Sequence, residues 1–232
     1  MAKTPKIKKK PGAKQSSSSK AKSKSVLPDL EACTRLTDRK RASIVRAAVM
    51  EFQARGYYAA SMNGIAQVAE VSKRTLYNHF DSKDALFNEM IEELLDRSGR
   101  LPACAFDAEG DLAEQLTELA HSEVAFLTSD AVQMLARAGM SRVLVEPGVG
   151  GRIAHKQLLR RVKDWLDEAY AAGCLQELDT DFAAQQFAGL LRTFTFWPSI
   201  LHGEPKPSKK RRDQVVESTV EMFLARYAVG EE

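Results

Sequence analysis

In the first third of the chain, apolar side chains recur at helical spacing in three short segments, and this pattern limits the possible folds more than any other feature. Ile44, Ala48 and Phe52 are four positions apart, so they share one face of a helix. Gly56 is suited to end that helix, because glycine readily adopts the left-handed conformation that closes many helices. We therefore expect an amphipathic helix over 37–55.

Two shorter segments follow, over 61–69 and 72–79, and each is too short to be stable as an isolated helix. Ser61 and Ser72 can cap their first turns. Because only a tight turn separates the two segments, their apolar faces can be buried only against each other and against the helix before them. The spacing predicts three short helices around one small core, which is the helix-turn-helix plan.

The rest of the chain also favours helices. Ala, Leu, Glu, Arg and Gln recur between turn signals, and no alternating β-branched run indicates a sheet. Further helices are expected over 82–97, 111–128, 130–145, 150–172, 180–201 and 209–228, which makes about nine in an all-α fold. Pro198 must end or kink the helix over 180–201, because proline has no amide hydrogen to donate.

Composition divides the 232 residues into three parts. Residues 1–33 begin with a Lys- and Ser-rich stretch that has almost nothing to bury, so we expect a disordered tail. This tail is either a solubilising segment or a polycationic arm that adds non-specific affinity for phosphate. Residues 34–83 form the expected helix-turn-helix domain, and residues 84–232 form a larger helical domain.

The formal net charge of +3 conceals a strong asymmetry. Residues 1–27 hold nine lysines and no acid, and residues 34–83 hold nine basic residues against four acids. Residues 84–232 hold 16 basic and 25 acidic residues, a net charge of −9. Charge segregated in this way indicates that the N-terminal part binds a polyanion and that the remainder does not.

Cys33, Cys104 and Cys174 are far apart and form no CxxC pair, so free thiols in a reducing compartment are expected rather than a zinc site. No apolar run is long enough to span a bilayer, and no apolar core of a secretory signal follows the basic N-terminus. We expect a cytoplasmic protein that carries neither metal nor cofactor.

Residues 72–80 have the form of a helix that enters the major groove of DNA. Val71, Leu76 and Phe80 can turn inward. The other positions of this segment carry Lys73, Arg74, Thr75, Tyr77, Asn78 and His79. Arginine can donate two hydrogen bonds to a guanine edge, threonine can offer a base its methyl or hydroxyl group, and Tyr, His and Lys can bond phosphates. Lys83 is a further expected phosphate contact. It opens the next helix, so its positive charge lies close to the free backbone amides of the first helical turn, which also attract anions.

A catalytic role for this cluster has little support. The four histidines, His79, His121, His155 and His202, form no HxxxH or HExxH pair. The chain has no GxSxG motif and no glycine-rich phosphate loop, so we do not expect an enzyme. A solvated amphipathic helix is the simpler alternative for residues 72–80, but cationic and aromatic groups crowd too few positions to favour it.

The stretch over 37–87, from "TDRKRASIVRAAVMEF" to "VSKRTLYNHFDSKDALF", resembles the DNA-binding domain of TetR-type transcriptional regulators. The likeness is carried by Ile44, Ala47-Ala48, Phe52, Gly56-Tyr57, Ser61-Met62, Ile65-Ala66, Ala69, Val71-Ser72, Thr75-Leu76-Tyr77, His79-Phe80, Ser82-Lys83 and Ala85-Leu86. The resemblance implies an all-α homodimer that binds a palindromic operator, usually as a repressor, and releases it on binding a small-molecule inducer.

The resemblance also implies roles for single residues. Phosphate contacts fall to Tyr77, His79 and Lys83, base contacts to Arg74 and Thr75, and either role to Lys73. Ser61, Ser72 and Asn78 complete the set of expected DNA-facing residues. One position departs from the family pattern: Glu70 stands in the turn where glycine is usual, which implies backbone strain or an altered turn.

Residues 146–203 resemble the ligand domain of an AefR-like subgroup, which is linked to the regulation of efflux and envelope-related genes. The helices over 180–201 and 209–228 then correspond to the pair that forms a four-helix bundle across the dimer axis. The residues that we expect at the dimer interface are Phe187, Leu190, Leu191, Val220 and Phe223.

The same domain must hold a ligand pocket. Its expected lining is His121, Phe126, Met134, Trp165, Phe194 and Trp197. Core packing is the simpler interpretation of the apolar members, and surface exposure is the simpler interpretation of His121. The net charge of −9 over 84–232 disfavours a strongly anionic ligand unless local groups overrule it.

These features predict a ligand-responsive transcriptional repressor, and two alternatives remain. The chain could instead be an activator or a regulator that needs no inducer. It could also be an all-helical carrier or enzyme that retains the N-terminal unit, which a catalytic constellation would favour. In the family plan, the helix that begins at Ser82 contacts both the DNA-binding unit and the pocket, so ligand binding would change the spacing of the two reading helices.

Overall fold

The computed structural model describes residues 36–99, 101, 104–146, 148–149 and 155–230. Within these residues the chain is helical, and the only β pairing is an isolated bridge between Leu175 and Ala228. The all-α prediction is therefore confirmed. The tail expected over 1–33 and the start of the helix expected at 150 lie outside the described residues.

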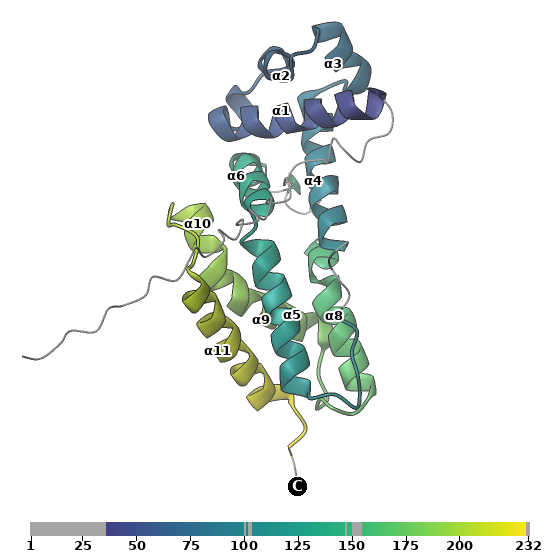
Figure 1. Ribbon diagram of the computed structural model, residues 1–232, viewed down its shortest axis with the longest axis vertical. Helices are drawn as coiled ribbons and strands as arrows, with labels where there is room; N and C mark the ends of the chain where they lie inside the picture. The colour runs from purple at the N-terminus through teal and green to yellow at the C-terminus, as the bar shows by residue number, and fades with distance from the viewer. Residues whose placement is uncertain (1–35, 100, 102–103, 147, 150–154, 231–232) are drawn as a thin grey trace, which may run out of the picture.

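Ten helices are described. At one end of the molecule, α1 (Leu36–Ala59), α2 (Met62–Val68) and α3 (Lys73–His79) form one unit, from which α4 (Lys83–Gly99) descends (Figure 1). The other end consists of α5 (Leu112–Leu127), α8 (His155–Ala171), α9 (Thr180–Thr195) and α11 (Lys209–Tyr227). Between the two ends lie α6 (Asp130–Val145), directly beneath α1, and the short α10 (Trp197–Leu201).

Two helix ends lie where glycine and proline predict them. Gly56 interrupts α1 with a φ of 74° and a ψ of 162°, a conformation that residues with a side chain rarely adopt. Pro198 lies in the first turn of α10, so the segment over 180–201 consists of two helices rather than one. Proline is tolerated there because the first amides of a helix have no intrahelical partner.

The first apolar core holds the N-terminal unit together and extends beyond it. Ile44 and Phe52 of α1, Ile65 of α2 and Leu76 of α3 are almost completely buried in this core. The core also includes Leu86, Phe87 and Met90 of α4, and Val132, Leu135 and Ala138 of α6. The packing therefore crosses the domain boundary predicted between residues 83 and 84, and α6 forms a floor under the N-terminal unit.

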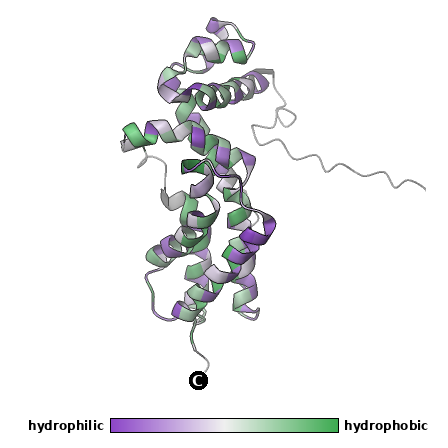
Figure 2. Cartoon of the chain, turned by 90° about the vertical axis from the view of Figure 1, so that its left-hand side faces the viewer, coloured by the Kyte–Doolittle hydropathy of each residue, from purple (hydrophilic) through white to green (hydrophobic). Residues whose placement is uncertain are grey.

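A second apolar core lies in the lower part of the molecule. It is formed by α5, α8, α9 and α11, and its largest buried side chains include Leu119, Trp165, Leu166 and Phe187. Figure 2 shows hydrophobic and hydrophilic residues mixed along each of these helices. Each helix thus buries one stripe, as amphipathic helices do.

A polar joint connects the N-terminal unit to α6. The Tyr57 hydroxyl donates to Asp84 Oδ1 at 2.8 Å, and Arg142 of α6 forms a salt bridge with the same carboxylate oxygen. The buried Arg142 guanidinium packs on two rings that meet edge to face, with its carbon 4.3 Å from the centre of Tyr57 and 4.7 Å from that of Phe87. Next to it, Tyr58 donates to Glu146 Oε1 at 2.8 Å.

The joint affects the protonation of its members. Burial, followed by the hydrogen bond to Asp84, raises the pKa of Tyr57 far above its usual value. The hydrogen bond from Tyr57, together with the positive charge of Arg142, lowers the pKa of Asp84. Tyr57 therefore remains a donor, and Asp84 an ionised acceptor, throughout the physiological pH range.

We expect Arg142→Ala to lower the free energy of unfolding by about 2–3 kcal/mol, because the change leaves a cavity beside the Tyr57 and Phe87 rings and removes the cation beside Asp84. Tyr57→Phe removes one hydrogen bond and should cost about 1 kcal/mol. Urea denaturation followed by circular dichroism measures both values.

Arg160→Ala is the matched control, since Arg160 forms an exposed pair with Asp164 and its loss should cost less than about 0.5 kcal/mol. A loss at Arg142 no larger than the loss at Arg160 would show that the joint does not stabilise the fold.

Candidate DNA-binding interface

The second helix of the unit is held by a serine cap and by one glycine. The Ser61 side chain accepts from the Gly64 amide at 3.0 Å, as the sequence predicts. Ile65 and Ala66 bury the inner face of α2. A side chain at Gly64 would collide with the carboxylate of Glu51, which is buried and paired with Arg55 at 3.2 Å. Gly64 therefore allows α2 to lie close against α1.

The turn between α2 and α3 passes through Glu70, which has a φ of 54° and is the only non-glycine residue with positive φ in the described chain. Its amide donates to Gln67 O at 3.2 Å, and the Val71 amide donates to Ala66 O at 3.0 Å. This pair of bonds closes the C-terminus of α2, in the position that glycine normally occupies. The strain implied by the sequence is therefore present.

The third helix begins at a second serine cap. The Ser72 hydroxyl accepts from the Thr75 amide at 3.0 Å and lies 2.8 Å from the Thr75 hydroxyl. Leu76 is completely buried and Phe80 nearly so, as expected, while Val71 is only partly buried. Two deeply buried side chains and one cap therefore determine which face of α3 points outward.

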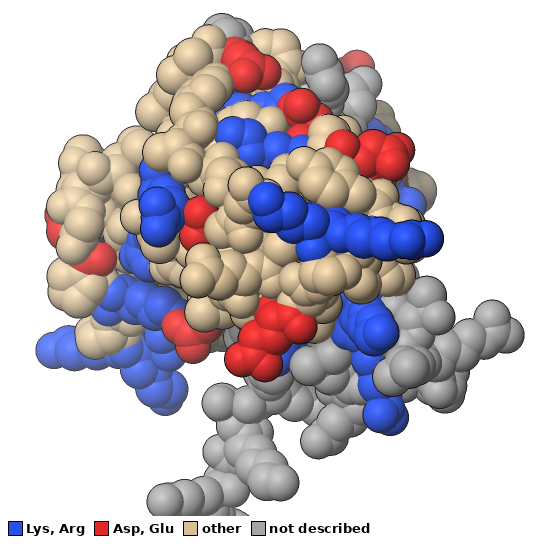
Figure 3. All heavy atoms as spheres, turned by 90° about the horizontal axis from the view of Figure 1, so that it is seen from above, with Lys and Arg blue, Asp and Glu red and all other residues tan. Residues whose placement is uncertain are grey.

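The outward face of α3 is polar, cationic and aromatic. Lys73, Arg74 and Asn78 are exposed, and Tyr77 exposes 48% of its surface. Thr75 and His79 are partly buried at the edges of this face. Figure 3 looks onto this end of the molecule, where Lys and Arg side chains cross the middle of the face and most Asp and Glu side chains lie toward its edges.

Arg41 fixes the C-terminal end of α3, a role that the sequence pattern did not reveal. Its guanidinium donates to both carboxylate oxygens of Glu89, at 2.8 and 3.2 Å, and to the carbonyl of His79 at 3.3 Å. The same group stacks on the Phe80 ring at 4.3 Å. One side chain of α1 thus connects α3 to α4. An arginine among several others on a helix gives no sequence signal that separates this role from DNA binding.

Lys83 also bonds within the chain. Its ammonium donates to the carbonyls of Tyr58 and Ala60, at 3.2 and 3.0 Å, and lies 4.6 Å from the centre of the Tyr57 ring. Lys83 therefore caps the end of α1. An ammonium has three hydrogens, so one remains for a phosphate beside the two that serve the carbonyls.

A cavity of about 580 Å³ lies between the C-terminal end of α4, α5 and α8. Of the six residues predicted to line a pocket, Trp165 lines this one. Phe126 and Met134 instead pack in the first apolar core. His121 is exposed, as are Phe194 and Trp197. The spacing of apolar residues could not identify the lining of this cavity, because an apolar side chain in a helix can face the core, a cavity or the solvent at the same spacing.

Comparison with known proteins agrees with this geometry. Residues 44–90 match the family model for bacterial regulatory proteins of the tetR family, and residues 114–229 match that for the C-terminal domain of AefR-like transcriptional repressors. The chain belongs to the TetR family of transcriptional regulators. Both resemblances seen in the sequence are thereby confirmed.

Solved structures of TetR-family proteins resemble this chain along most of its length. A TetR family transcriptional regulator from Pseudomonas syringae pv. tomato is 37% identical, with a TM-score of 0.75 over 84% of this chain and 100% of that one. The flavonoid-responsive regulator FrrA is 29% identical, with a TM-score of 0.67 and the same coverage.

A curated relative is similar over a shorter segment. The transcriptional activator FasR from Mycolicibacterium smegmatis is 42% identical over 59 residues, which are 25% of this chain and 27% of that activator.

In this TetR-family chain, the residues expected at the dimer interface do not share one surface. Phe187, Leu191, Val220 and Phe223 are buried in the second apolar core, where the rings of Phe187 and Phe223 meet edge to face at 5.2 Å. Leu190 is partly exposed and lines two clefts between α9 and α11. Four of the five side chains thus pack against their own domain.

The outer surface of α9 and α11 presents other apolar groups. Phe194 exposes 45% of its surface and Met222 exposes 57%. Together with Leu190 they line the cleft between the two helices, and the Arg211 guanidinium lies 5.5 Å from the centre of the Phe194 ring. We call Leu190, Phe194 and Met222 the outer apolar face. No described helix of the chain is long and apolar enough to cross a membrane.

Glu70→Gly should raise the free energy of unfolding by about 0.5–1 kcal/mol, because glycine adopts the left-handed backbone of the turn without steric cost. Urea denaturation monitored by circular dichroism measures the change. Glu70→Ala is the matched control, since it removes the carboxylate but keeps the strained backbone. Equal stability of the two variants would show that the backbone of this turn is not strained.

Proposed function

We propose that this chain is a cytoplasmic, homodimeric repressor that binds a palindromic operator and releases it when a small molecule enters the domain below. The observation that supports this function best is the outward face of α3, which is cationic, exposed and held in place from three sides. Leu76 and Phe80 hold it from within, the Ser72 cap holds its start, and Arg41 holds its end.

The exposed positions of α3 match the chemistry of the major groove. Arg74 lies in the first turn, where recognition helices meet base edges, and we assign base contacts to it and to Thr75. We assign phosphate contacts to Lys73, Tyr77 and His79, with the remaining hydrogen of Lys83. Ser61, Ser72 and Asn78 are also exposed and complete the proposed interface.

Dimerisation requires an apolar surface that repeats about a twofold axis. The outer apolar face supplies exposed side chains from both α9 and α11, and Gly189 beside Leu190 allows a close approach. We therefore assign the dimer interface to Leu190, Phe194 and Met222. A twofold axis there would place the two α3 helices on one side of the dimer. To read half-sites separated by one turn of DNA, these two helices must lie about 34–36 Å from each other.

The match of the C-terminal domain favours repression over activation. Residues 114–229 match a model of repressor C-terminal domains, whereas the activator FasR shares a segment of only 59 residues with this chain. The C-terminal domain determines how a ligand acts, so its similarity weighs more than that of a short segment.

The route from ligand to DNA runs along α4. Leu95, Ser98 and Gly99, at its C-terminal end, line the cavity, and Asp84, at its first turn, belongs to the joint with Tyr57 and Arg142. A ligand that displaces the lower end of α4 would thus move the N-terminal unit through a bonded contact. Release follows only if the ligand binds more tightly to the conformation that does not fit the operator.

Arg74→Ala should weaken binding to the operator by about 1–3 kcal/mol and relax the preference at one base pair, because a hydrogen-bonded base contact is lost. Fluorescence anisotropy with the footprinted operator and with its single-base variants measures both effects. Arg160→Ala on α8 is the control and should leave DNA binding unchanged. An equal loss on operator and on random DNA would show that Arg74 does not read sequence.

Met222→Glu should convert the dimer to monomers at micromolar concentration, since the change places a charge in an apolar interface. Sedimentation velocity measures the mass, starting from 25.7 kDa chains. Tyr170→Glu, at an exposed position of α8, is the matched control and should leave the dimer intact. A dimer that survives Met222→Glu would place the interface elsewhere.

A further inference from the structure

Glu89, in the second turn of α4, is the acid that holds Arg41 in place. Its two carboxylate oxygens accept from Nε and Nη2 of the arginine, at 3.2 and 2.8 Å, while Nη1 donates to the carbonyl of His79 at 3.3 Å. The arginine side chain is 42% exposed and that of Glu89 is 30% exposed. An ion pair this exposed adds little to the free energy of unfolding, so its main effect is on geometry.

The orientation of the arginine depends on both oxygens of Glu89. A guanidinium that is held along one edge by a carboxylate is restricted to the plane of that carboxylate. In this orientation its carbon lies 4.3 Å from the centre of the Phe80 ring, and its third nitrogen reaches the carbonyl of the last residue of α3. The C-terminal end of α3 is thus positioned in part by an acid of α4, which lies outside the helix-turn-helix.

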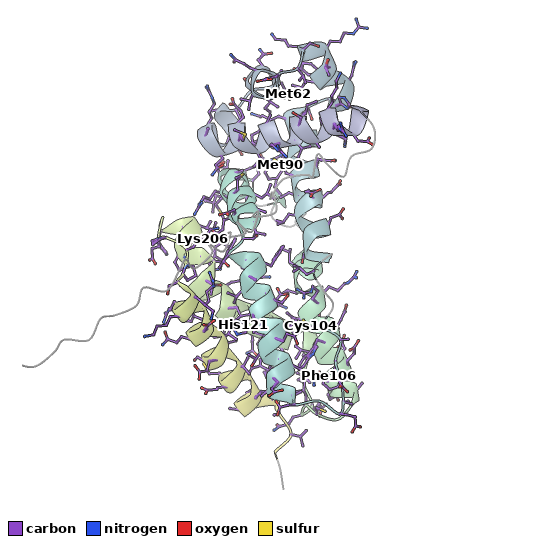
Figure 4. All side chains as sticks on the ribbon, in the orientation of Figure 1. Met62, Met90, Cys104, Phe106, His121 and Lys206 are labelled. Carbon is purple, nitrogen blue, oxygen red and sulfur yellow. The ribbon has the colours of Figure 1, made fainter. Side chains whose placement is uncertain are left out.

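Two contacts tie α1 to α4, one near each end of α1. Tyr57, close to the C-terminal end of α1, bonds to Asp84, and Arg41, close to its N-terminal end, bonds to Glu89. The two acids are five residues apart, which places them about 140° apart around a helix of 3.6 residues per turn. They flank the buried face of α4, which includes Met90, labelled below α1 in Figure 4. Rotation of α4 about its own axis would therefore displace α1 at both contacts.

The charge of Glu89 opposes DNA binding. A carboxylate beside the end of α3 repels phosphates and pairs with Arg41, which could otherwise bind one. If charge were its only effect, removal of Glu89 would strengthen binding to every DNA sequence equally. A contact that orients α3 has a different effect, because base contacts specify sequence and depend on orientation, whereas phosphate contacts carry no sequence information.

We propose that Glu89 is a specificity-determining residue for DNA recognition, because through Arg41 it holds α3 at the angle at which its outward face meets the bases. It is a positioning residue and touches no base itself. This inference rests on the proposed function, in which α3 reads an operator. Glu89 then lowers the affinity for DNA in general and raises the preference for the operator.

Glu89→Gln tests the proposal, because glutamine keeps the size of the side chain and offers the arginine one oxygen instead of two. Fluorescence anisotropy with the full-length chain measures the affinity for the footprinted operator and for a random duplex of the same length. The ratio of the two affinities should fall about three- to tenfold, as the loss of one hydrogen bond allows. An equal change in both affinities would overturn the proposal, since charge alone, or a loss of folded protein, gives that result.

Glu92→Gln is the matched control. Glu92 is exposed and lies three residues further along α4, so this variant removes the same charge and keeps both bonds between Glu89 and Arg41. Its ratio of affinities should equal that of the wild-type chain. A fall as large as that of Glu89→Gln would assign the effect to the charge of α4 and contradict a role for the contact.

Arg41→Lys tests the other side of the contact. Lysine keeps the positive charge but has one nitrogen, so it cannot hold both oxygens of Glu89 and the carbonyl of His79 in one plane. The ratio should fall as it does in Glu89→Gln, and the double variant should fall no further, because both changes break the same contact. An unchanged ratio in Arg41→Lys, or losses that multiply in the double variant, would show that the two residues act independently and would overturn the proposal.

The wild-type chain separates this inference from the function on which it rests. Equal binding of the wild-type chain to operator and random DNA would contradict sequence-specific DNA binding itself. If the wild-type chain prefers the operator and Glu89→Gln is equally selective, only the positioning role of Glu89 is contradicted, and the DNA-binding function stands.

Discussion

The contact between Arg142 and the Tyr57–Asp84 pair is the interaction on which the arrangement of the two halves depends. It joins the end of α1, the start of α4 and the end of α6 within one hydrogen-bonded group. The apolar core around it would allow small sliding movements, since apolar contacts have little directionality. A charged group that packs on two rings and is bonded to a carboxylate allows far fewer positions. The orientation of α3 relative to the lower domain is therefore set at this joint.

The parts of the fold that follow from local physics could be predicted from the sequence. The stripe through Ile44, Ala48 and Phe52, the two serine caps and the strained Glu70 each depend on a few neighbouring residues, and the structure confirms them. The division of 180–201 into two helices also followed from the chemistry of proline. In a short three-helix unit, each apolar side chain has only one core that it can join.

The larger domain was less predictable for a physical reason. Its helices have two apolar surfaces, one toward their own core and one toward a partner or cavity, and both repeat with the same helical period. Sequence alone therefore assigned Phe187 and Phe223 to an interface between subunits, whereas both pack inside the domain, and Phe194 and Met222 of the same helices lie outside. Arg41 and Lys83 were equally hard to distinguish, because a cation that caps a helix and a cation that binds DNA look the same in a sequence.

The pairing of Arg41 and Arg55 with carboxylates of the chain affects how strongly salt should weaken DNA binding. Residues 34–83 contain nine basic side chains, but Arg41 and Arg55 pair with carboxylates within the chain, whereas the carbonyl partners of Lys83 are neutral and leave its charge available to a phosphate. Each phosphate neutralised by a protein cation adds about 0.9 to the slope of log affinity against log salt concentration, because it releases a counterion. The slope for this unit thus counts the cations left on the reading face, and formal charge overstates the number of ions released into solution when the protein binds.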